Sequence, residues 1–228
     1  MPHPLDRPIW SALTGRQAHL ALGGGRALRI DPAIGLFAAA AQPADGEALA
    51  GFMADGSPLI LFEDAAVPPP RPDTSVVAEP MVQMVADTIS TPPDGAPIVP
   101  LGDVDAAEML ALATLTRPGP FLARTHELGG FVGIRAGGRL VAMTGTRLRV
   151  DGHVEVSAVC THPDHRGAGH AARLIATVAA AIMAAGDQPF LHTFAHNVGA
   201  IGLYERLGFR IRRRPVAVML TPPPLSPR

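Results

Sequence analysis

The feature that most constrains this chain is a short glycine-rich segment between two regular elements. Residues 166–171 have the sequence RGAGHA. A strand pattern precedes them, and the large apolar residues of 169–185 recur at helical spacing. Gly167 and Gly169 remove side chains where the backbone has to approach another group closely. The first amides of a helix lack internal acceptors and lie at the positive end of its dipole, so the segment predicts a cradle for phosphate or pyrophosphate.

The kind of anion is limited by what the chain lacks. The sequence contains no lysine, so all 19 basic residues are arginine and the Gly-Lys-Ser/Thr loop that binds nucleotide triphosphates is excluded. A dinucleotide-binding loop has the spacing G-x-G-x-x-G and an acidic residue after the following strand. Here the spacing is only G-x-G, and the next strand pattern ends in HTF at residues 192–194. Dinucleotide binding is therefore disfavoured.

Charge and hydropathy exclude other classes of protein. The net charge of -1 argues against a protein that coats nucleic acid or lies on a membrane surface. Residues 161–228 nevertheless have eight arginines and only three acidic residues, so an anionic ligand would be sought there. Whether Arg210 or residues 212–214 contact such a ligand stays an open question.

The longest apolar stretch, 171–186, contains Arg173 and is shorter than the roughly 20 residues of a membrane span. The start of the chain shows no targeting signal, and a single cysteine suits a reducing compartment, so we expect a cytoplasmic location.

Proline clusters divide the chain. Prolines recur up to residue 100, and we place the domain boundary in the segment 94–100. Residues 1–94 then form a supporting α+β domain with a hairpin turn at 23–25, a short helix at 44–53 and a strand at 58–62. The segment 76–89 is ambiguous because Pro80 interrupts it.

Residues 95–228 have clearer patterns and predict a mixed, mainly antiparallel sheet flanked by helices, which is an α+β fold. The turns at Gly137-Gly138 and Asp151-Gly152 join three strand patterns in succession. The expected helices are 103–115, 169–185 and 200–207. The expected strands are 131–135, 139–150, 154–160, 188–194 and 216–220.

Two blocks of sequence resemble the GNAT acyltransferase superfamily. RGAGHA matches the pattern R/Q-x-x-G-x-G/A, and NVGAIGLYERLGF at 197–209 follows it at the expected distance. The stretch EVSAVCTHPDHRGAGHAARL is most similar to the branch related to glycine N-acyltransferases. The resemblance covers about residues 98–220. It implies the GNAT fold for 95–228, with a degenerate half-copy of that fold as an alternative origin for the N-terminal segment.

The resemblance also implies an activity, N-acetyl transfer from acetyl-CoA to a primary amine, and it implies the residues that bind the donor. Amides of the glycine-rich loop would bind the CoA pyrophosphate, and the backbone of residues 159–161 would pair with the pantetheine arm as another strand does. The CoA-binding residues are then Val159, Cys160, Thr161, Arg166, Gly167, Ala168, Gly169, His170, Ala171, Asn197, Ala200 and Tyr204.

Two catalytic residues follow by the same resemblance. Tyr204, the only tyrosine, would protonate the leaving thiolate, and a phenol is a proton donor at neutral pH. Glu155 is the only acid in the strand 154–160, where the family places a general base that often acts through water. Alternation from Glu155 predicts that Ser157 and Val159 lie on the same face and line the acyl site.

Other functions stay open at this point. Cys160, His162, His165 and His170 have spacings that invite a metal site, although the turn residues between them explain the spacing and we expect no metal. Cys160 as a nucleophile is a weaker alternative. A non-catalytic acyl-CoA sensor or interaction domain is the strongest one. The identity of the amine is not determined by these motifs, and homodimer formation also stays open.

Overall fold

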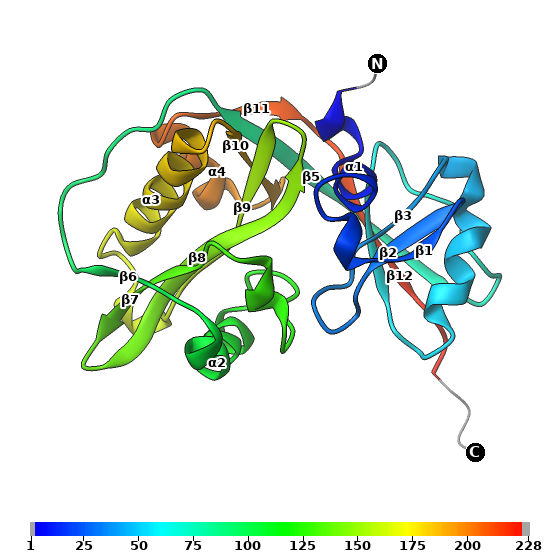
Figure 1. Ribbon diagram of the computed structural model, residues 1–228, viewed down its shortest axis with the longest axis horizontal. Helices are drawn as coiled ribbons and strands as arrows, with labels where there is room; N and C mark the ends of the chain where they lie inside the picture. Colours follow the sequence, from blue (N-terminus) through cyan, green and yellow to red (C-terminus); the bar gives the residue numbers. More distant parts are fainter. Residues whose placement is uncertain (1–2, 225–228) are drawn as a thin grey trace.

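The computed structural model of the chain describes residues 3–224, which form two lobes joined by one long strand, β5 (Figure 1). Five strands precede residue 94: β1 (Ala21–Gly24), β2 (Ala27–Ile30), β3 (Ala38–Ala40), β4 (Leu59–Glu63) and β5 (Ser75–Ala86). Seven follow it: β6 (Ile98–Pro100), β7 (Val132–Ala136), β8 (Arg139–Val150), β9 (His153–Thr161), β10 (Gln188–Phe194), β11 (Phe209–Arg213) and β12 (Val216–Thr221). The α-helices are α1 (Pro8–Thr14), α2 (Ala106–Thr116), α3 (His170–Ala184) and α4 (Val198–Arg206).

The strands form a small and a large sheet. The small one has the order β1-β2-β3. The large one has nine strands in the order β4-β12-β5-β10-β9-β8-β7-β6, and β11 pairs with β5 beside this path. Its strand pairs are antiparallel except β9 with β10, which confirms the predicted α+β fold with a mainly antiparallel sheet flanked by helices.

β5 belongs to both lobes. Its first half pairs with the last strand of the chain, β12, which in turn pairs with β4. Its second half pairs with β10 and β11. Residues on both sides of position 94 therefore share one sheet. The boundary at residue 94 therefore does not separate two sheets. The division into domains 1–94 and 95–228 remains a prediction.

β9 and β10 separate along their length. They pair only over 153–155 and 188–190, although both strands continue beyond that point. β9 is also irregular, because Ala158 has a left-handed φ of 53° and the register with β8 shifts around it. A register shift of this kind is a β-bulge, which bends a strand and re-aims its side chains. The result is an opening in the sheet edged by residues 156–161 of β9.

α2 and α3 cover opposite faces of the large sheet. The adjacent β8 residues Leu140 and Val141 point to opposite faces. Leu140 packs in the apolar cluster that contains Met109 and Leu112 of α2, which we call the α2 cluster, and Val141 packs in the cluster that contains Leu174 of α3. α3 buries Leu174, Ile175 and Val178 at helical spacing. α3 begins directly after the glycine-rich loop, which places the start of this helix at the opening between β9 and β10.

Most predicted elements are confirmed within one to three residues at each end, and β8 and β10 match in full. The strands and α-helices that were not predicted are α1, β3, β6 and β11. Residues 43–53 form a 3₁₀ helix, which confirms the short helix expected over 44–53. The ambiguous segment 76–89 is mainly the strand β5. Pro80 is tolerated there because it lies where β5 changes partner, and its carbonyl accepts a hydrogen bond from the amide of Ala195.

Candidate functional site

A cavity of about 570 Å³ lies at the start of α3; we call it the glycine-loop cavity. It is bounded by the end of β9, the glycine-rich loop, and parts of α2, α3 and α4. Its lining residues are Thr116, Val159, Cys160, Thr161, His165, Arg166, Gly167, Gly169, His170, Ala171, Ala172, Gly199, Ala200 and Leu203. Nine of the twelve residues predicted to bind CoA are among them. Ala168 belongs to the loop but does not line the cavity, and Asn197 and Tyr204 line a neighbouring one.

The loop presents a run of free amides. Within the described residues, the backbone amides from Gly167 to Ala172 donate to no protein acceptor. Gly167 and Gly169 have left-handed φ values of 80° and 73°, and a Cβ added to either would meet only open space. Nδ1 of His170 is buried without a hydrogen-bond partner. Free amides at a helix N-terminus, together with an unpartnered buried nitrogen, are what an oxygen-rich anion would satisfy.

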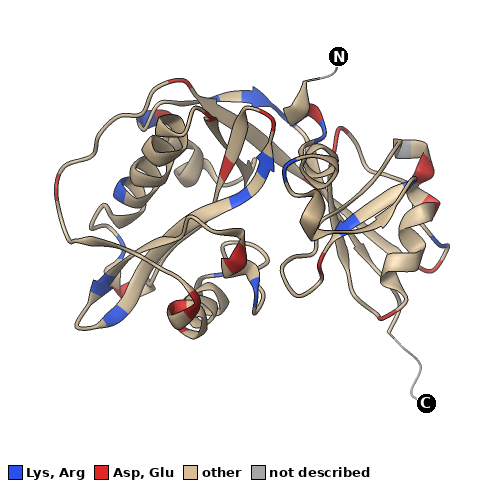
Figure 2. Ribbon diagram, in the orientation of Figure 1, with Lys and Arg blue, Asp and Glu red and all other residues tan. Residues whose placement is uncertain are grey.

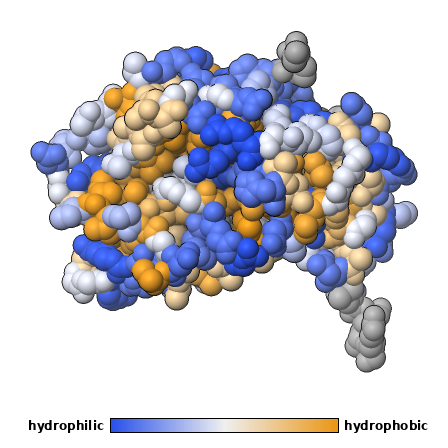
Figure 3. Space-filling view, viewed as in Figure 1, coloured by the Kyte–Doolittle hydropathy of each residue, from blue (hydrophilic) through white to orange (hydrophobic). Residues whose placement is uncertain are grey.

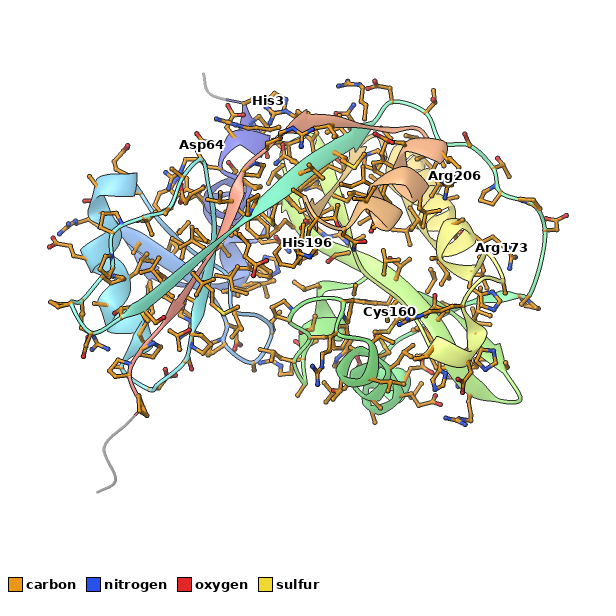
Figure 4. All side chains as sticks on the ribbon, turned by 180° about the vertical axis from the view of Figure 1, so that it is seen from behind. His3, Asp64, Cys160, Arg173, His196 and Arg206 are labelled. Carbon is orange, nitrogen blue, oxygen red and sulfur yellow. The ribbon has the colours of Figure 1, made fainter. Side chains whose placement is uncertain are left out.

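Several arginines of residues 161–228 have partners within the protein. Arg166 lines the glycine-loop cavity, whereas the guanidinium of Arg173 donates to the carbonyl of Ala96 in the segment 94–100 (Figure 4). Charges of both signs are spread over both lobes in Figure 2. Arginines of β11 pair with acids from earlier in the chain: Arg210 with Asp87, Arg212 with Asp6, and Arg213 with Asp6 and Asp64. Within the described residues, ion pairs thus engage Arg210, Arg212 and Arg213 but not Arg214.

A second cavity of about 550 Å³ adjoins the first at Val159, which lines both; we call it the sheet-face cavity. It lies between the face of β4, β12 and β5, the bulged part of β9, the end of β10 and the segment 117–120 after α2. Figure 4 looks toward the junction of the lobes, where His196 follows the end of β10. Two neighbouring chambers that meet at the opening of the sheet could hold two substrates with their reacting groups at the junction.

Tyr204 lines the sheet-face cavity from α4. The side chain is buried and packs edge to face against Phe209, with ring centroids 6.1 Å apart. Its hydroxyl makes no hydrogen bond to the described residues, and it is not among the fully buried side-chain atoms that lack a partner. Burial raises the pKa of Tyr204 to about 12. The phenol therefore keeps its proton at neutral pH and could donate it to a group in the cavity.

Asn197 caps α4 and also lines the sheet-face cavity. Its Oδ1 accepts a hydrogen bond from the amide of Ala200 at 3.2 Å. This leaves the Nδ2 hydrogens free to contact a ligand near the junction of the two cavities.

Glu155 lies beneath the cavities in a buried network. Its carboxylate accepts hydrogen bonds from Arg147 at 2.6 and 2.8 Å and lies 2.6 Å from Nδ1 of His192. Its side chain has no exposed surface and does not line either cavity. Burial by itself would raise the pKa of this carboxyl, but the charges and hydrogen bonds of Arg147 and His192 lower it to about 2. So weak a base, with both oxygens occupied, is poorly suited to take a proton from an amine directly.

The bulge explains why the predicted alternation along β9 is wrong for Glu155. Ser157 and Val159 line the sheet-face cavity as expected, but Val156 and Ala158 line it too, and Glu155 does not. The left-handed φ at Ala158 and a second register shift with β8, between Val154 and Val156, interrupt the period of two. A catalytic role for Glu155 remains a prediction. We limit it to a role exerted through Arg147 and His192, the two residues that Glu155 holds.

Several residues of the sheet-face cavity were missed from the sequence: Phe37, Phe62, Glu79, Arg117, Arg147 and His192. Arg147 could have been found, because it lies four residues before the Asp151-Gly152 turn and Glu155 lies three residues after it, so a hairpin brings the two close together. The others come from segments distant in sequence and show no motif.

Cys160 lies in the α2 cluster, next to the glycine-loop cavity (Figure 4). Burial raises the pKa of its thiol to about 11. A thiol with so high a pKa is almost entirely protonated at neutral pH and is a poor nucleophile.

Cys160→Ala is therefore expected to leave the turnover number within about threefold of the wild-type value, since only packing is lost. Steady-state assay of the variant with acetyl-CoA and an amine would measure this. An inactive but folded variant would instead support a covalent acyl-cysteine mechanism.

The described residues 3–224 contain no group of three or more His, Cys, Asp and Glu side chains placed to hold a metal ion. None of their helices has the length and apolar character needed to cross a membrane.

Comparisons with known proteins agree with this geometry. Residues 131–218 match the model of the FR47-like protein family. A search of curated proteins gave no match. A solved structure from Novosphingobium aromaticivorans, described as an acetyltransferase of the GNAT family, is 46% identical, covers 97% of this chain and 100% of its own, and has a TM-score of 0.91.

Two more distant structures share the fold over nearly the whole chain. A GCN5-related N-acetyltransferase from Kribbella flavida is 21% identical, with a TM-score of 0.63, and covers 95% of this chain and 94% of its own. A GCN5-related N-acetyltransferase-like protein from Streptococcus suis is 17% identical, with a TM-score of 0.59, and covers 96% of this chain and 93% of its own. The shared fold includes the N-terminal lobe.

Proposed function

Because the chain belongs to the GNAT acetyltransferase family, we propose that it transfers an acetyl group from acetyl-CoA to a primary amine by direct attack in a ternary complex. The observation that supports this most is the run of free amides from Gly167 to Ala172 beside the unpaired edge of β9. We extend the proposal to a place in the branch related to glycine N-acyltransferases and to a cytoplasmic location.

Acetyl-CoA would occupy the glycine-loop cavity. The free amides and the positive end of the α3 dipole would bind its pyrophosphate, assisted by Arg166. The unpaired edge of β9 at residues 159–161 would pair with the amides of the pantetheine arm. The acetyl group would then lie at the junction of the two cavities, near Val159.

The reaction would take place where the sheet opens. A backbone amide at Val159 or Cys160, re-aimed by the bulge, would stabilise the oxyanion of the tetrahedral intermediate. The Tyr204 hydroxyl would protonate the departing thiolate. Glu155 would hold Arg147 and His192 in place beneath the acceptor.

The test is an assay of CoA release with a broad panel of primary amines, after calorimetry has established acetyl-CoA binding. We expect release to require an amine, and initial rates to give intersecting lines when both substrates are varied, as a ternary complex requires. Parallel lines would contradict direct attack. Binding of acetyl-CoA with no turnover on any amine would favour the sensor function, and absence of binding would refute the assignment of the glycine-loop cavity.

A further inference from the structure

Three strands present one continuous side-chain face to the sheet-face cavity. β12 pairs with β5 on one side and with β4 on the other, so side chains fall in rows across the strands. One row is Val77, Met219 and Ile60, and the next is Glu79, Ala217 and Phe62. All six line the cavity. The floor of the cavity is therefore apolar at every one of these positions except Glu79.

Glu79 differs from the other acids near the cavities. It is the one carboxylate among the described residues that line the sheet-face cavity. Its side chain is exposed, and in residues 3–224 it makes no ion pair and no side-chain hydrogen bond. By comparison, Glu63 on the neighbouring strand β4 pairs with Arg7, and Glu155 pairs with Arg147. Glu79 thus places an uncompensated negative charge in the cavity that also contains Tyr204.

His192 is a weaker candidate for accepting the proton of the amine. Nδ1 lies 2.6 Å from the Glu155 carboxylate, and Nε2 lies 3.1 Å from Nε2 of Gln83. Gln83 is itself fixed by a hydrogen bond to the carbonyl of Leu5. With both ring nitrogens engaged and 1% of the side chain exposed, His192 has no free lone pair to offer.

The cavity also indicates the body of the acceptor. Val77, Phe194 and Met219 line it and are 50%, 40% and 42% exposed. On the face seen in Figure 3, hydrophobic residues surface in small areas among hydrophilic ones, whereas these three border one cavity. Exposed apolar side chains that line a cavity favour a ligand with apolar surface of its own.

The positive charges of the cavity are partly neutralised. The Arg147 guanidinium is compensated by Glu155 and lies over the rings of Phe37 and Phe62, at 4.8 and 5.5 Å from their centroids. Among the described residues that line the cavity, this leaves Glu79, on β5, and Arg117, directly after α2, as the uncompensated charges. An ammonium would be attracted to the Glu79 side.

We propose that Glu79 binds the ammonium of the acceptor and accepts its proton, and that the acceptor is a primary amine with an apolar body lying on the face of β4, β12 and β5. This inference rests on the proposed acetyl transfer. Glu79 is then a catalytic residue, and Glu155 is a positioning residue.

The proton and bond changes balance. The Glu79 carboxylate takes one proton from the ammonium, and the free amine forms a C–N bond to the thioester carbon. As the intermediate collapses, the C–S bond breaks and the thiolate takes a proton from Tyr204. A second proton from the nitrogen restores the Tyr204 hydroxyl, and Glu79 releases its proton to solvent. The net products are the acetamide, CoA and one proton.

The experiment uses the full chain, with phenethylamine and methylamine as acceptor probes. We expect phenethylamine to be the better substrate in kcat/KM, because only it covers the apolar floor. Glu79→Gln should lower kcat/KM for phenethylamine by about 100-fold, the usual size of general-base effects, and weaken its binding to the CoA-loaded protein by about tenfold. Glu79→Asp should recover part of the loss. Met219→Ser should raise KM for phenethylamine about fivefold and leave methylamine unchanged.

The matched control is Glu47→Gln, since Glu47 is an exposed glutamate of the N-terminal lobe, paired only with Arg26, and does not line either cavity. If the wild type acetylates amines and Glu79→Gln keeps kcat/KM within threefold, the role of Glu79 is refuted while the acetyl transfer stands. If the wild type binds CoA but acetylates no amine, the proposed activity fails. In that case weaker phenethylamine binding by Glu79→Gln supports the ammonium site, and equal binding refutes it. Equal kcat/KM for the two amines would overturn the apolar acceptor.

Discussion

Tyr204→Phe is expected to lower kcat by about 100-fold while leaving the affinity for acetyl-CoA unchanged. The phenol is the proton donor that lines the cavity next to the expected thioester, and its pKa of about 12 keeps it protonated throughout the usable pH range. The change removes only the hydroxyl, which has no hydrogen-bond partner among the described residues, so folding should be unaffected. Calorimetry with acetyl-CoA and single-turnover rates with a saturating amine would separate binding from chemistry.

The control for this variant is Phe209→Leu. Phe209 contacts the edge of the Tyr204 ring, so its replacement disturbs the same packing but keeps the hydroxyl. We expect some loss of stability and little change in the chemical rate. If Tyr204→Phe keeps its single-turnover rate, the thiolate leaves without help from this residue, and Tyr204 has no part in the mechanism.

The sequence predicted those parts of the site that depend on local structure. The glycine-rich loop and the position of Tyr204 each follow from residues within one strand-loop-helix unit or one helix. Glycine conformations and helix N-termini depend on near neighbours, and these features recur wherever the local pattern does. The strands and helices after residue 100, apart from β11, were predictable for the same reason.

The parts that were missed depend on pairings between distant segments. Glu79 faces the site only because β5 runs through both lobes and β12 returns from the far end of the chain to pair with it. The segment that forms β5 was ambiguous from the sequence because it contains Pro80, and proline normally interrupts a central strand. Nothing within a few residues of Glu79 indicates these partners.

The assignment of Glu155 shows a different limit. The residue type and strand position suggested a base, but its environment is set by Arg147 across a hairpin and His192 on a parallel neighbour. A carboxylate on an apolar strand must be either functional or paired. The sequence alone did not distinguish between these two cases, and the geometry shows a paired carboxylate.

Glu155→Gln is accordingly expected to destabilise the fold by about 3 kcal/mol, which is the lower end of the cost of breaking a buried ion pair. The change leaves the Arg147 guanidinium, which is 15% exposed, without its counter-charge. For a chain of this length the melting temperature should fall by roughly 10 °C. Asp64→Asn makes the same chemical change in an exposed pair with Arg213 and should shift the melting temperature little. Equal shifts for the two variants would contradict a structural role for Glu155.

The pH dependence of this loss has a definite sign. The folded-state pKa of Glu155, about 2, lies below its ordinary value of 4.5, so the ionised carboxylate stabilises the fold above about pH 4.5. As the pH falls from 4.5 toward 2, the wild-type protein loses the stabilisation that comes from the ionised carboxylate. The Glu155→Gln variant has no carboxylate at this position, so its stability does not change for this reason. Denaturant unfolding at a series of pH values should therefore show the stability difference between the two proteins narrowing over this window. A stability difference that stays constant with pH would mean that the cost of Glu155→Gln comes from packing.

The double variant Arg147→Met, Glu155→Leu separates the same two explanations. If the cost comes from a broken buried ion pair, replacing both partners with apolar residues should recover part of the lost stability. If the cost comes from packing, the double variant should recover none.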